Sequence, residues 1–302
     1  MKNLSASIRA RLRNSARQHG QDFNRLSLLF FQERFLARLS RSSHAKHFVL
    51  KGGLYLYARF GQAARPTKDM DVLARGIPSD LETITKIIRE VLEVTLPDGV
   101  QFKPQSVTAS RIKEGAEYEG VRVNFEGHLD GMRQVLQVDV GFGDVVNPVP
   151  QAFDFPVILE DLSVPHLRAY SLETVIAEKF QAMTMLGENN SRAKDFYDIW
   201  YASQHQAFDA TTLRQTIQAT FQHRQTPLEY SQSLFTPEFA NGGYIQQAWA
   251  AFRKNNPHLN APESLALLLE RVQAFLEPLL QGDAAGQWNP VFVRWEAAGP
   301  GA

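Results

Sequence analysis

Two aspartates separated by a single residue, Asp69 and Asp71, are the pair whose type and spacing point most directly to chemistry. They lie in the run KDMDVLA, which we predict to be a β-strand. Side chains alternate between the two faces of a strand, so both carboxylates project to one side, about 7 Å apart along the chain. Such a pair repels itself in a half-buried place unless a cation holds it, and the usual cation is Mg²⁺ bridging to substrate phosphates.

A Gly-Gly pair lies upstream, between a short apolar strand at 48–50 and a helix-like run at 54–60. Glycine allows close backbone approach, and free N–H groups at the start of a helix bind phosphates. Alone, a Gly-Gly is usually a turn and an Asp-x-Asp usually a solvated strand edge, so the weight comes from their order on strand, helix and strand. The predicted nucleotide-binding residues are Lys51, Gly52, Gly53, Thr67 and Lys68.

Gly-Gly followed by a strand with Asp-x-Asp resembles the nucleotidyltransferase fold of the DNA polymerase β superfamily. The particular form, KGG followed by RPTKDMDV, resembles the AbiEii/AbiGii-type toxins of bacterial toxin–antitoxin and phage-defence systems. Two departures stand out: the 16 positions from Gly53 to Asp69 are slightly more than usual, and Gly53 stands where many members have Ser. We expect the loop at 61–66 to hold the extra length. The resemblance implies an α+β fold, a mixed sheet with flanking helices, followed by a helical C-terminal domain.

A third carboxylate is predicted on a hairpin further along the chain. Residues 121–126 and 135–142 alternate as strands, with a turn at Asp130-Gly131 between them. Polymerase β-like enzymes add an acidic residue from a neighbouring strand, and Asp139 is the best match here. A structural strand aspartate is the alternative, and Asp144 is a weaker competitor because it follows a glycine in a loop. The predicted metal ligands are Asp69, Asp71 and Asp139.

Lys179 lies on the apolar stripe of a helix that Ser171 is expected to cap. A lysine on a core-facing stripe is costly unless it has a partner, and a phosphate would provide one. The alternative is a lysine at the margin of the stripe whose ammonium reaches water.

The next helix, which Ser191 is expected to cap, begins in the run KDFYDIW. This run, with the preceding EKF, again resembles the toxin family, whose later motifs supply a lysine and an aspartate to the site. The resemblance assigns these roles to Lys179 and Asp195, with Asp198 as the alternative aspartate. A purely structural pairing of Asp195 with a nearby cation is the other interpretation.

Length and composition fit an ordinary globular protein of two domains. The 302 residues are 44% hydrophobic and 21% charged, and we divide them into a nucleotidyltransferase domain, 1–165, and a mainly helical domain, 166–302, completing the active site. The chain has no cysteine, so carboxylates and histidines remain as metal ligands, and oxygen ligands favour Mg²⁺ or Mn²⁺. No stretch reads as a membrane span or signal peptide, which favours the cytoplasm.

The charge is zero overall but unevenly placed. Residues 1–50 hold ten Lys or Arg and two Asp or Glu, largely in two predicted helices at 4–18 and 22–40. This excess can mark a polyanion-binding face, although a charge-rich helix is more often simply solvated.

The remaining pattern predicts a helix at 80–94 capped by Ser79, one or two strands at 100–112, and an extended connector at 148–165. Further predicted elements are helices at 211–221, 243–253 and 261–280, and a segment at 288–295 that docks as a strand.

These residues predict an enzyme that moves a nucleoside monophosphate from a nucleoside triphosphate to an acceptor hydroxyl. Asp139 would complete the metal site or deprotonate the acceptor. The family resemblance further implies a growth-inhibiting toxin, with tRNA 3′ ends as acceptor and a cognate antitoxin. Two alternatives stay open: a protein or small-molecule acceptor, and a nucleotide-binding regulator without turnover.

Overall fold

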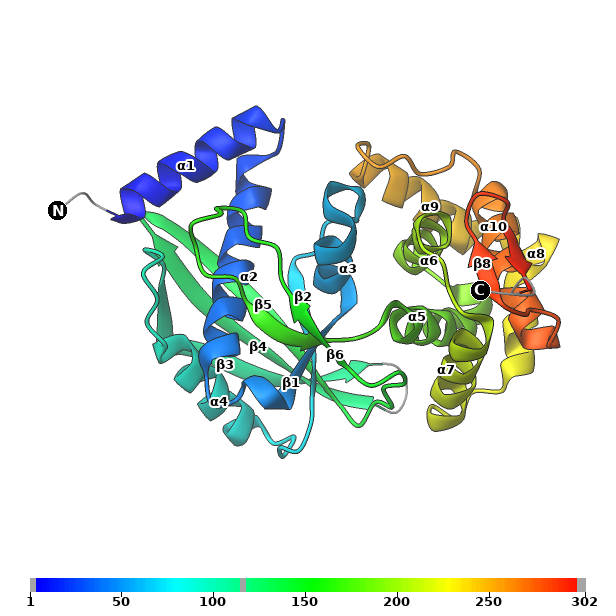
Figure 1. Cartoon of the computed structure of the whole chain (residues 1–302), viewed down its shortest axis with the longest axis horizontal. Coiled ribbons are helices and arrows are strands. Elements are labelled where there is room, and N and C mark those ends of the chain that lie inside the picture. Colours follow the sequence, from blue (N-terminus) through cyan, green and yellow to red (C-terminus); the bar gives the residue numbers. More distant parts are fainter. Residues whose placement is uncertain (1–3, 115–117, 298–302) are drawn as a thin grey trace. The chain divides into compact units, whose positions relative to one another are not determined.

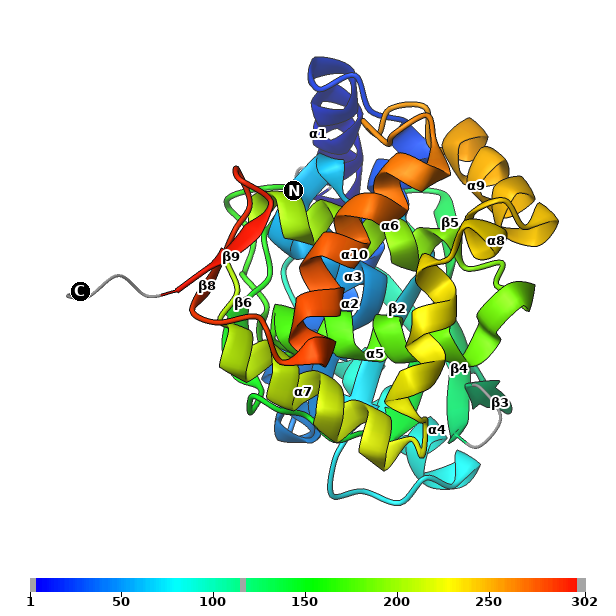
Figure 2. The ribbon, with the colours of Figure 1, turned by 90° about the vertical axis from the view of Figure 1, so that its right-hand side faces the viewer.

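The computed structural model describes residues 4–114 and 118–297, which form two compact units; Figure 1 follows them along the chain and Figure 2 gives a second view. The first, the sheet unit, takes the described residues up to Arg59, together with Pro66–Gly143 and Gln151–Ala169. The second, the helical unit, takes Phe60–Arg65, Asp144–Pro150 and the described residues from Tyr170 onward.

The sheet unit is built on a mixed sheet of seven strands in the order β3-β4-β5-β2-β1-β7-β6. Strand β2 is parallel to β5, and β1 is parallel to β7, whereas the other neighbours are antiparallel. The strands are β1 Phe48–Lys51, β2 Asp69–Ala74, β3 Gln101–Glu114, β4 Tyr118–Leu129, β5 Met132–Phe142, β6 Gln151–Asp154 and β7 His166–Ala169. The predicted mixed sheet is therefore present.

The hairpin β4–β5 turns at the two predicted residues. Asp130 and Gly131 both have positive φ, 41° and 77°, the conformation that a two-residue hairpin turn requires and that glycine adopts without strain. The turn fixes the register, because Leu129 pairs with Met132 and each earlier residue of β4 pairs with a later one of β5.

Helices α2 (Phe23–Arg41) and α4 (Leu81–Glu93) pack on the sheet, and α1 (Leu4–Gln18) packs on α2. The core between α2 and the sheet is aromatic: the ring centroid of Phe35 lies 5.0 Å from that of Phe125 on β4. Because side chains alternate along a strand, burying Phe125 on this face leaves the neighbouring polar side chains of β4 on the opposite face.

Several local predictions for the sheet unit need correction. Helix α3 (Gly52–Phe60) begins directly after β1, two residues earlier than predicted. The cap of α4 is Asp80, whose carboxylate accepts a hydrogen bond from the Thr83 N–H, and not Ser79. The predicted connector contains β6, which pairs with β7 at the edge of the sheet.

The helical unit packs around buried aromatic residues. The ring centroids of Phe180 on α5 and Phe221 on α7 lie 5.3 Å apart, and those of Phe275 on α10 and Trp288 lie 4.9 Å apart. The helices are α5 Leu172–Leu186, α6 Ala193–His205, α7 Ala210–His223, α8 Pro237–Ala240, α9 Gly243–Asn255 and α10 Leu265–Gln281, followed by a hairpin of β8 Gln287–Asn289 and β9 Arg294–Glu296. The docking strand predicted near residue 288 is therefore half of a hairpin.

Helix starts in this unit depend on their caps. Ser171 caps α5 as predicted, by accepting a hydrogen bond from the Thr174 N–H. Ser191 does not cap α6, since Arg192 is the preceding residue and gives no side-chain cap. Helix α10 begins four residues later than predicted because Ser264 is its cap.

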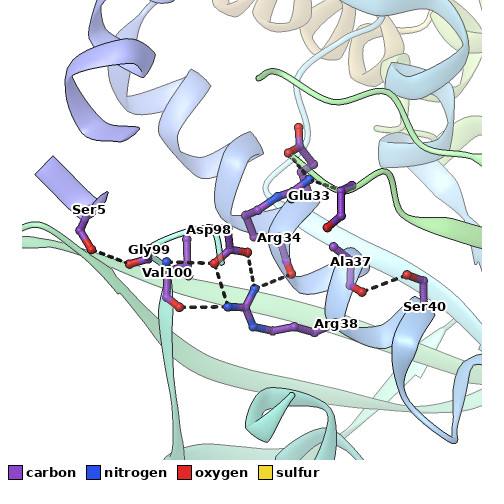
Figure 3. Close-up of polar contacts among 10 residues, drawn as sticks. Ser5, Glu33, Arg34, Ala37, Arg38, Ser40, Asp98, Gly99 and Val100 are labelled. Carbon is purple, nitrogen blue, oxygen red and sulfur yellow. Dashed lines mark hydrogen bonds and ion pairs between the residues drawn. The ribbon is translucent and has the colours of Figure 1, made fainter. Parts of the chain in front are cut away.

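Helix α2 holds buried charges, shown in Figure 3. Arg38 donates to both carboxylate oxygens of Asp98, at 2.8 and 3.0 Å, and the fully buried Arg34 pairs with Glu33 at 2.5 Å. These two arginines therefore form ion pairs inside the sheet unit and are unavailable to a polyanion. This corrects the prediction that the basic residues of 1–50 can together mark a polyanion-binding face.

The four arginines of α1 divide into two kinds. Arg9 pairs with Asp130, and Arg11 pairs with Asp161, whereas Arg13 and Arg17 are exposed on α1.

Among the described residues, the structure contains no helix with the length and apolar character needed to cross a lipid bilayer.

Candidate active site

Three carboxylates meet on the polar face of the sheet. Asp69 and Asp71 lie on β2, and Asp139 lies on the neighbouring parallel strand β5, directly opposite Asp71 in register. Met70 and Val72 point the other way and are buried, at 0% and 1% exposed. One oxygen from each of the three carboxylates lies within 4.8 Å of the others. An all-oxygen donor set of this spacing fits Mg²⁺ or Mn²⁺.

A row of charges crosses the sheet through this carboxylate triad, Asp69, Asp71 and Asp139. Residues paired in register project to the same face. Lys51 on β1 is opposite Asp71, Asp71 is opposite Asp139, and Asp139 is opposite Arg122 on β4. The acidic centre therefore has a basic residue on each side, and Lys51 is buried at 6% exposed.

Gly52 makes the closest backbone approach to the triad. Its φ is +68°, and a Cβ added there would lie 1.9 Å from Asp71 Oδ2. Only glycine fits both the backbone conformation and the space. The Gly-Gly of the sequence therefore brings the start of α3 against one of the proposed metal ligands.

We expect Gly52→Ala to displace Asp71 and to abolish most activity. The strain of positive φ adds a loss of about 1 to 2 kcal/mol in the free energy of unfolding. Gly61→Ala is the matched control, because Gly61 has a similar φ of +61° with nothing within 4 Å of its Cβ. Urea unfolding and a transfer assay on both variants check this. Equal activity losses in the two would show that crowding of Asp71 is not the cause.

The residues preceding β2 are held at the edge of the triad. The Thr67 hydroxyl donates to the Asp69 carboxylate, and Gln32 of α2 donates to the Lys68 carbonyl at 3.1 Å. Lys68 itself is exposed. The predicted nucleotide-binding residues of the sheet unit thus flank the carboxylates on β1, α3 and the entry to β2, while Gly53 is buried in the first turn of α3.

Arg122 is a site residue that the sequence reasoning missed. Its Nε donates to Asp139 Oδ1 at 2.8 Å, and its Nη2 donates to Oδ2 at 2.7 Å. This hydrogen bond raises the pKa of the Arg122 guanidinium, and the charges of Asp69 and Asp71 add to the effect. A signal existed, because the two-residue turn predicted at 130–131 places residue 122 opposite residue 139.

The helical unit contains a second cluster of charges around Lys179. Its ammonium lies 2.7 Å from Asp195 Oδ1 and 2.7 Å from Asp198 Oδ2. Arg192 pairs with the other oxygen of Asp195 at 2.5 Å, and Arg65 donates to Asp198 at 3.1 Å. The three central side chains are 11%, 0% and 3% exposed, so this is a buried network that needs every member.

The protonation states in this cluster follow from the pairing. Burial by itself raises the pKa of Asp195, but the charges of Lys179 and Arg192 outweigh it and lower this pKa to about 2. Burial likewise lowers the pKa of Lys179, and the two aspartates overcome it so that the net shift is upward. The lysine on the apolar stripe therefore has two carboxylate partners. A catalytic role for Lys179, Asp195 or Asp198 stays a prediction.

Asp144, the competitor for the third carboxylate, belongs to the helical unit, where it accepts a hydrogen bond from Arg224 at 2.9 Å.

Comparison with known proteins gave one family match. A family model described as "Nucleotidyl transferase AbiEii toxin, Type IV TA system" matches residues 34–278. No curated protein matched.

Solved structures with some likeness include a protein described as a nucleotidyltransferase from H. pylori, at 14% identity and a TM-score of 0.47, covering 86% of this chain and 95% of that one. JHP933 from Helicobacter pylori is 16% identical with a TM-score of 0.39, and the match covers 78% of this chain and 95% of that one. The antibiotic-resistance factor ANT(2'')-Ia is 15% identical with a TM-score of 0.26, and the match covers 76% of this chain and 94% of that one.

Proposed function

This chain belongs to the AbiEii family of nucleotidyl transferase toxins of type IV toxin–antitoxin systems, and we propose that it uses Mg²⁺ to transfer a nucleoside monophosphate from a nucleoside triphosphate to a hydroxyl of RNA, with tRNA 3′ ends as the acceptor. Family membership confirms the predicted enzyme class and the polymerase β-like nucleotidyltransferase fold. The metal, the nucleotide and the acceptor are parts of the proposal.

The observation that carries the proposal is the carboxylate triad on β2 and β5. Asp69 and Asp71 would hold the divalent cation, and Asp139 would complete its ligands or accept the hydroxyl proton. A bound Mg²⁺ would supply positive charge where negative charge develops on the transferred phosphoryl group.

In the proposed step the acceptor hydroxyl oxygen forms a bond to the α-phosphorus of the triphosphate. The bond from that phosphorus to the oxygen bridging the α- and β-phosphates breaks, and pyrophosphate leaves with the electron pair. The hydroxyl proton passes to Asp139 or to water. Lys51, the start of α3 at Gly52-Gly53, and Thr67 with Lys68 would hold the triphosphate.

Lys179 and Asp195 are proposed as further site residues on the strength of the family resemblance. A lysine ammonium would neutralise phosphate charge as it develops, and Asp195 would orient that ammonium through the 2.7 Å contact. A cognate antitoxin is implied by the system to which the family belongs. Since nucleoside triphosphates and tRNA are the proposed substrates, we place the reaction in the cytoplasm.

The direct test is to incubate the purified protein with each α-labelled nucleoside triphosphate, Mg²⁺ and total cellular RNA. Label should pass to RNA from one or a few of the four nucleotides, and EDTA should prevent it. Label on protein or on small molecules instead would move the acceptor to another class. Binding of a nucleotide without any transfer would leave a regulator as the function.

The RNA acceptor predicts a salt dependence that depends on the exposed arginines of α1. We expect Arg13→Gln with Arg17→Gln to weaken RNA binding and to flatten the plot of log affinity against log salt by about 0.7 to 0.9 for each RNA phosphate that is no longer neutralised. Nucleotide binding should not change. Arg9→Gln is the control, because Arg9 already pairs with Asp130 and should contribute less. An unchanged slope in the double variant would exclude α1 from the RNA-binding surface.

A further inference from the structure

Arg122 binds Asp139 closely, yet the proposed reaction assigns no role to this arginine. The guanidinium and the Asp139 carboxylate form a planar fork of two hydrogen bonds. Gln137, on β5 like Asp139, adds two contacts: its Nε2 lies 3.3 Å from Oδ1 and 3.1 Å from Oδ2 of Asp139. Asp139 is thus contacted by donors on both of its oxygens.

These contacts compete with a metal ion. The Arg122 fork takes one lone pair on each oxygen of Asp139, and Gln137 Nε2 lies within hydrogen-bond distance of both oxygens, so three donor nitrogens surround this carboxylate. A cation that takes Asp139 as a ligand therefore competes with these donors. The positive charge of Arg122 also opposes the approach of a divalent cation to this side of the triad.

Resting on the function proposed above, we propose that Arg122 exchanges partners: it holds Asp139 in the metal-free enzyme and moves to a phosphate group of a substrate when Asp139 takes up the divalent cation. The Arg122 side chain is 39% exposed and that of Asp139 only 6%, so the arginine can move outward while the carboxylate stays in place. A guanidinium presents the same fork to a phosphate as to a carboxylate. The exchange keeps Arg122 paired in both states.

The same hairpin provides a matched control. Arg133 makes the same kind of fork to Glu126, donating from Nε to Oε2 at 2.9 Å and from Nη2 to Oε1. Glu126 is outside the carboxylate triad. Arg133→Met therefore removes an arginine–carboxylate fork from β4–β5 without touching the proposed metal ligands.

The first measurement is Mn²⁺ binding by calorimetry, without nucleotide. Arg122→Met should raise the Mn²⁺ affinity by about tenfold, because it removes a nearby positive charge and frees the lone pairs of Asp139. Arg122→Lys keeps the positive charge, so its Mn²⁺ affinity should stay within about threefold of the wild-type value. It is the variant to measure if Arg122→Met folds poorly. Arg133→Met should leave Mn²⁺ affinity unchanged. A purely structural role for Arg122 predicts no gain in affinity.

The second measurement uses saturating Mn²⁺ and two phosphate probes, inorganic tripolyphosphate and a short single-stranded RNA. Removing a charge-assisted fork should weaken binding of one probe to Arg122→Met by about tenfold or more, and not to Arg133→Met. Weakened tripolyphosphate binding places the phosphate on the nucleotide, and weakened RNA binding places it on the acceptor.

Unchanged Mn²⁺ affinity in Arg122→Met, or unchanged binding of both probes, overturns the partner exchange. These results leave the proposed function intact, since wild-type protein still binds Mn²⁺ and transfers nucleotide. If the wild type binds no Mn²⁺, the metal-dependent function itself fails and the exchange with it.

Discussion

Replacing Asp71 by Asn should abolish nucleotide transfer while the protein stays folded. The amide keeps the shape of the side chain but removes the charge that binds Mg²⁺, so we expect transfer to fall by at least about 10³-fold. In the metal-free protein the change relieves repulsion within the triad but also removes the negative charge opposite the buried Lys51, so we expect little net change in stability. Thermal unfolding with and without Mg²⁺ gives a second readout, because the wild type should gain stability from the ion and the variant should not.

Asp69→Asn should behave in the same way, whereas Asp154→Asn is the control. Asp154 lies on β6 of the same sheet, and its side chain is 70% exposed and pairs with His166. A transfer rate at the wild-type level in either Asp69→Asn or Asp71→Asn would remove β2 from the active site. Equal stabilisation of wild type and Asp71→Asn by Mg²⁺ would remove the triad as the metal site.

Lys179→Met should destabilise the helical unit by about 3 to 5 kcal/mol, because it leaves two buried carboxylates without their shared cation. Asp195 shows the size of the coupling: its pKa is lowered from 3.8 to about 2, which corresponds to about 2 kcal/mol. This part of the stability is present above about pH 4 and is lost as the pH falls through 2. Lys194→Met is the control, since Lys194 lies beside Asp195 on α6 but is exposed.

Two further measurements separate structure from catalysis at this position. Adding Asp198→Asn to Lys179→Met removes a buried carboxylate that then has only Arg65 as its cation, and it should restore part of the stability in urea unfolding. If Lys179 acts on the reacting phosphate, transfer per folded molecule should stay at least about 100-fold below wild type in this repaired variant. Recovery of wild-type transfer together with stability would make the cluster purely structural.

Local patterns were sufficient for much of the fold. The alternation of polar and apolar residues placed Asp69 and Asp71 on one face of β2, and the glycine at 131 located the turn between β4 and β5. Ser171 was readable as the cap of α5. These features depend on a few neighbouring residues, so the sequence contains the whole cause.

The start of α6 was predicted wrongly, with Ser191 as its cap, because it depends on tertiary packing. A helix can begin without a side-chain cap when tertiary packing holds its first turn, and α6 begins after Arg192 with its first aspartate bound to Lys179. The short strands β6 and β7 were missed because four residues carry little pattern; β7 is stabilised by pairing with β1, and β6 by pairing with β7.

The sequence by itself determined which residues could form the site: the aspartates of β2, Asp139 on the hairpin, the Gly-Gly and a lysine on an apolar helix face. It also contained the pairing of Arg122 with Asp139, because an antiparallel hairpin with a two-residue turn has a register that can be counted.

Only the tertiary structure decided that Asp71 lies opposite Asp139, 68 residues away, since no turn fixes the register of parallel strands from separate parts of the chain. It also decided that Gly52 is packed against Asp71, and that Lys179 is paired with Asp195 and Asp198. Helical periodicity shows which face of α5 is buried, but the charge that meets a buried lysine comes from another helix, whose position depends on the packing of the whole unit.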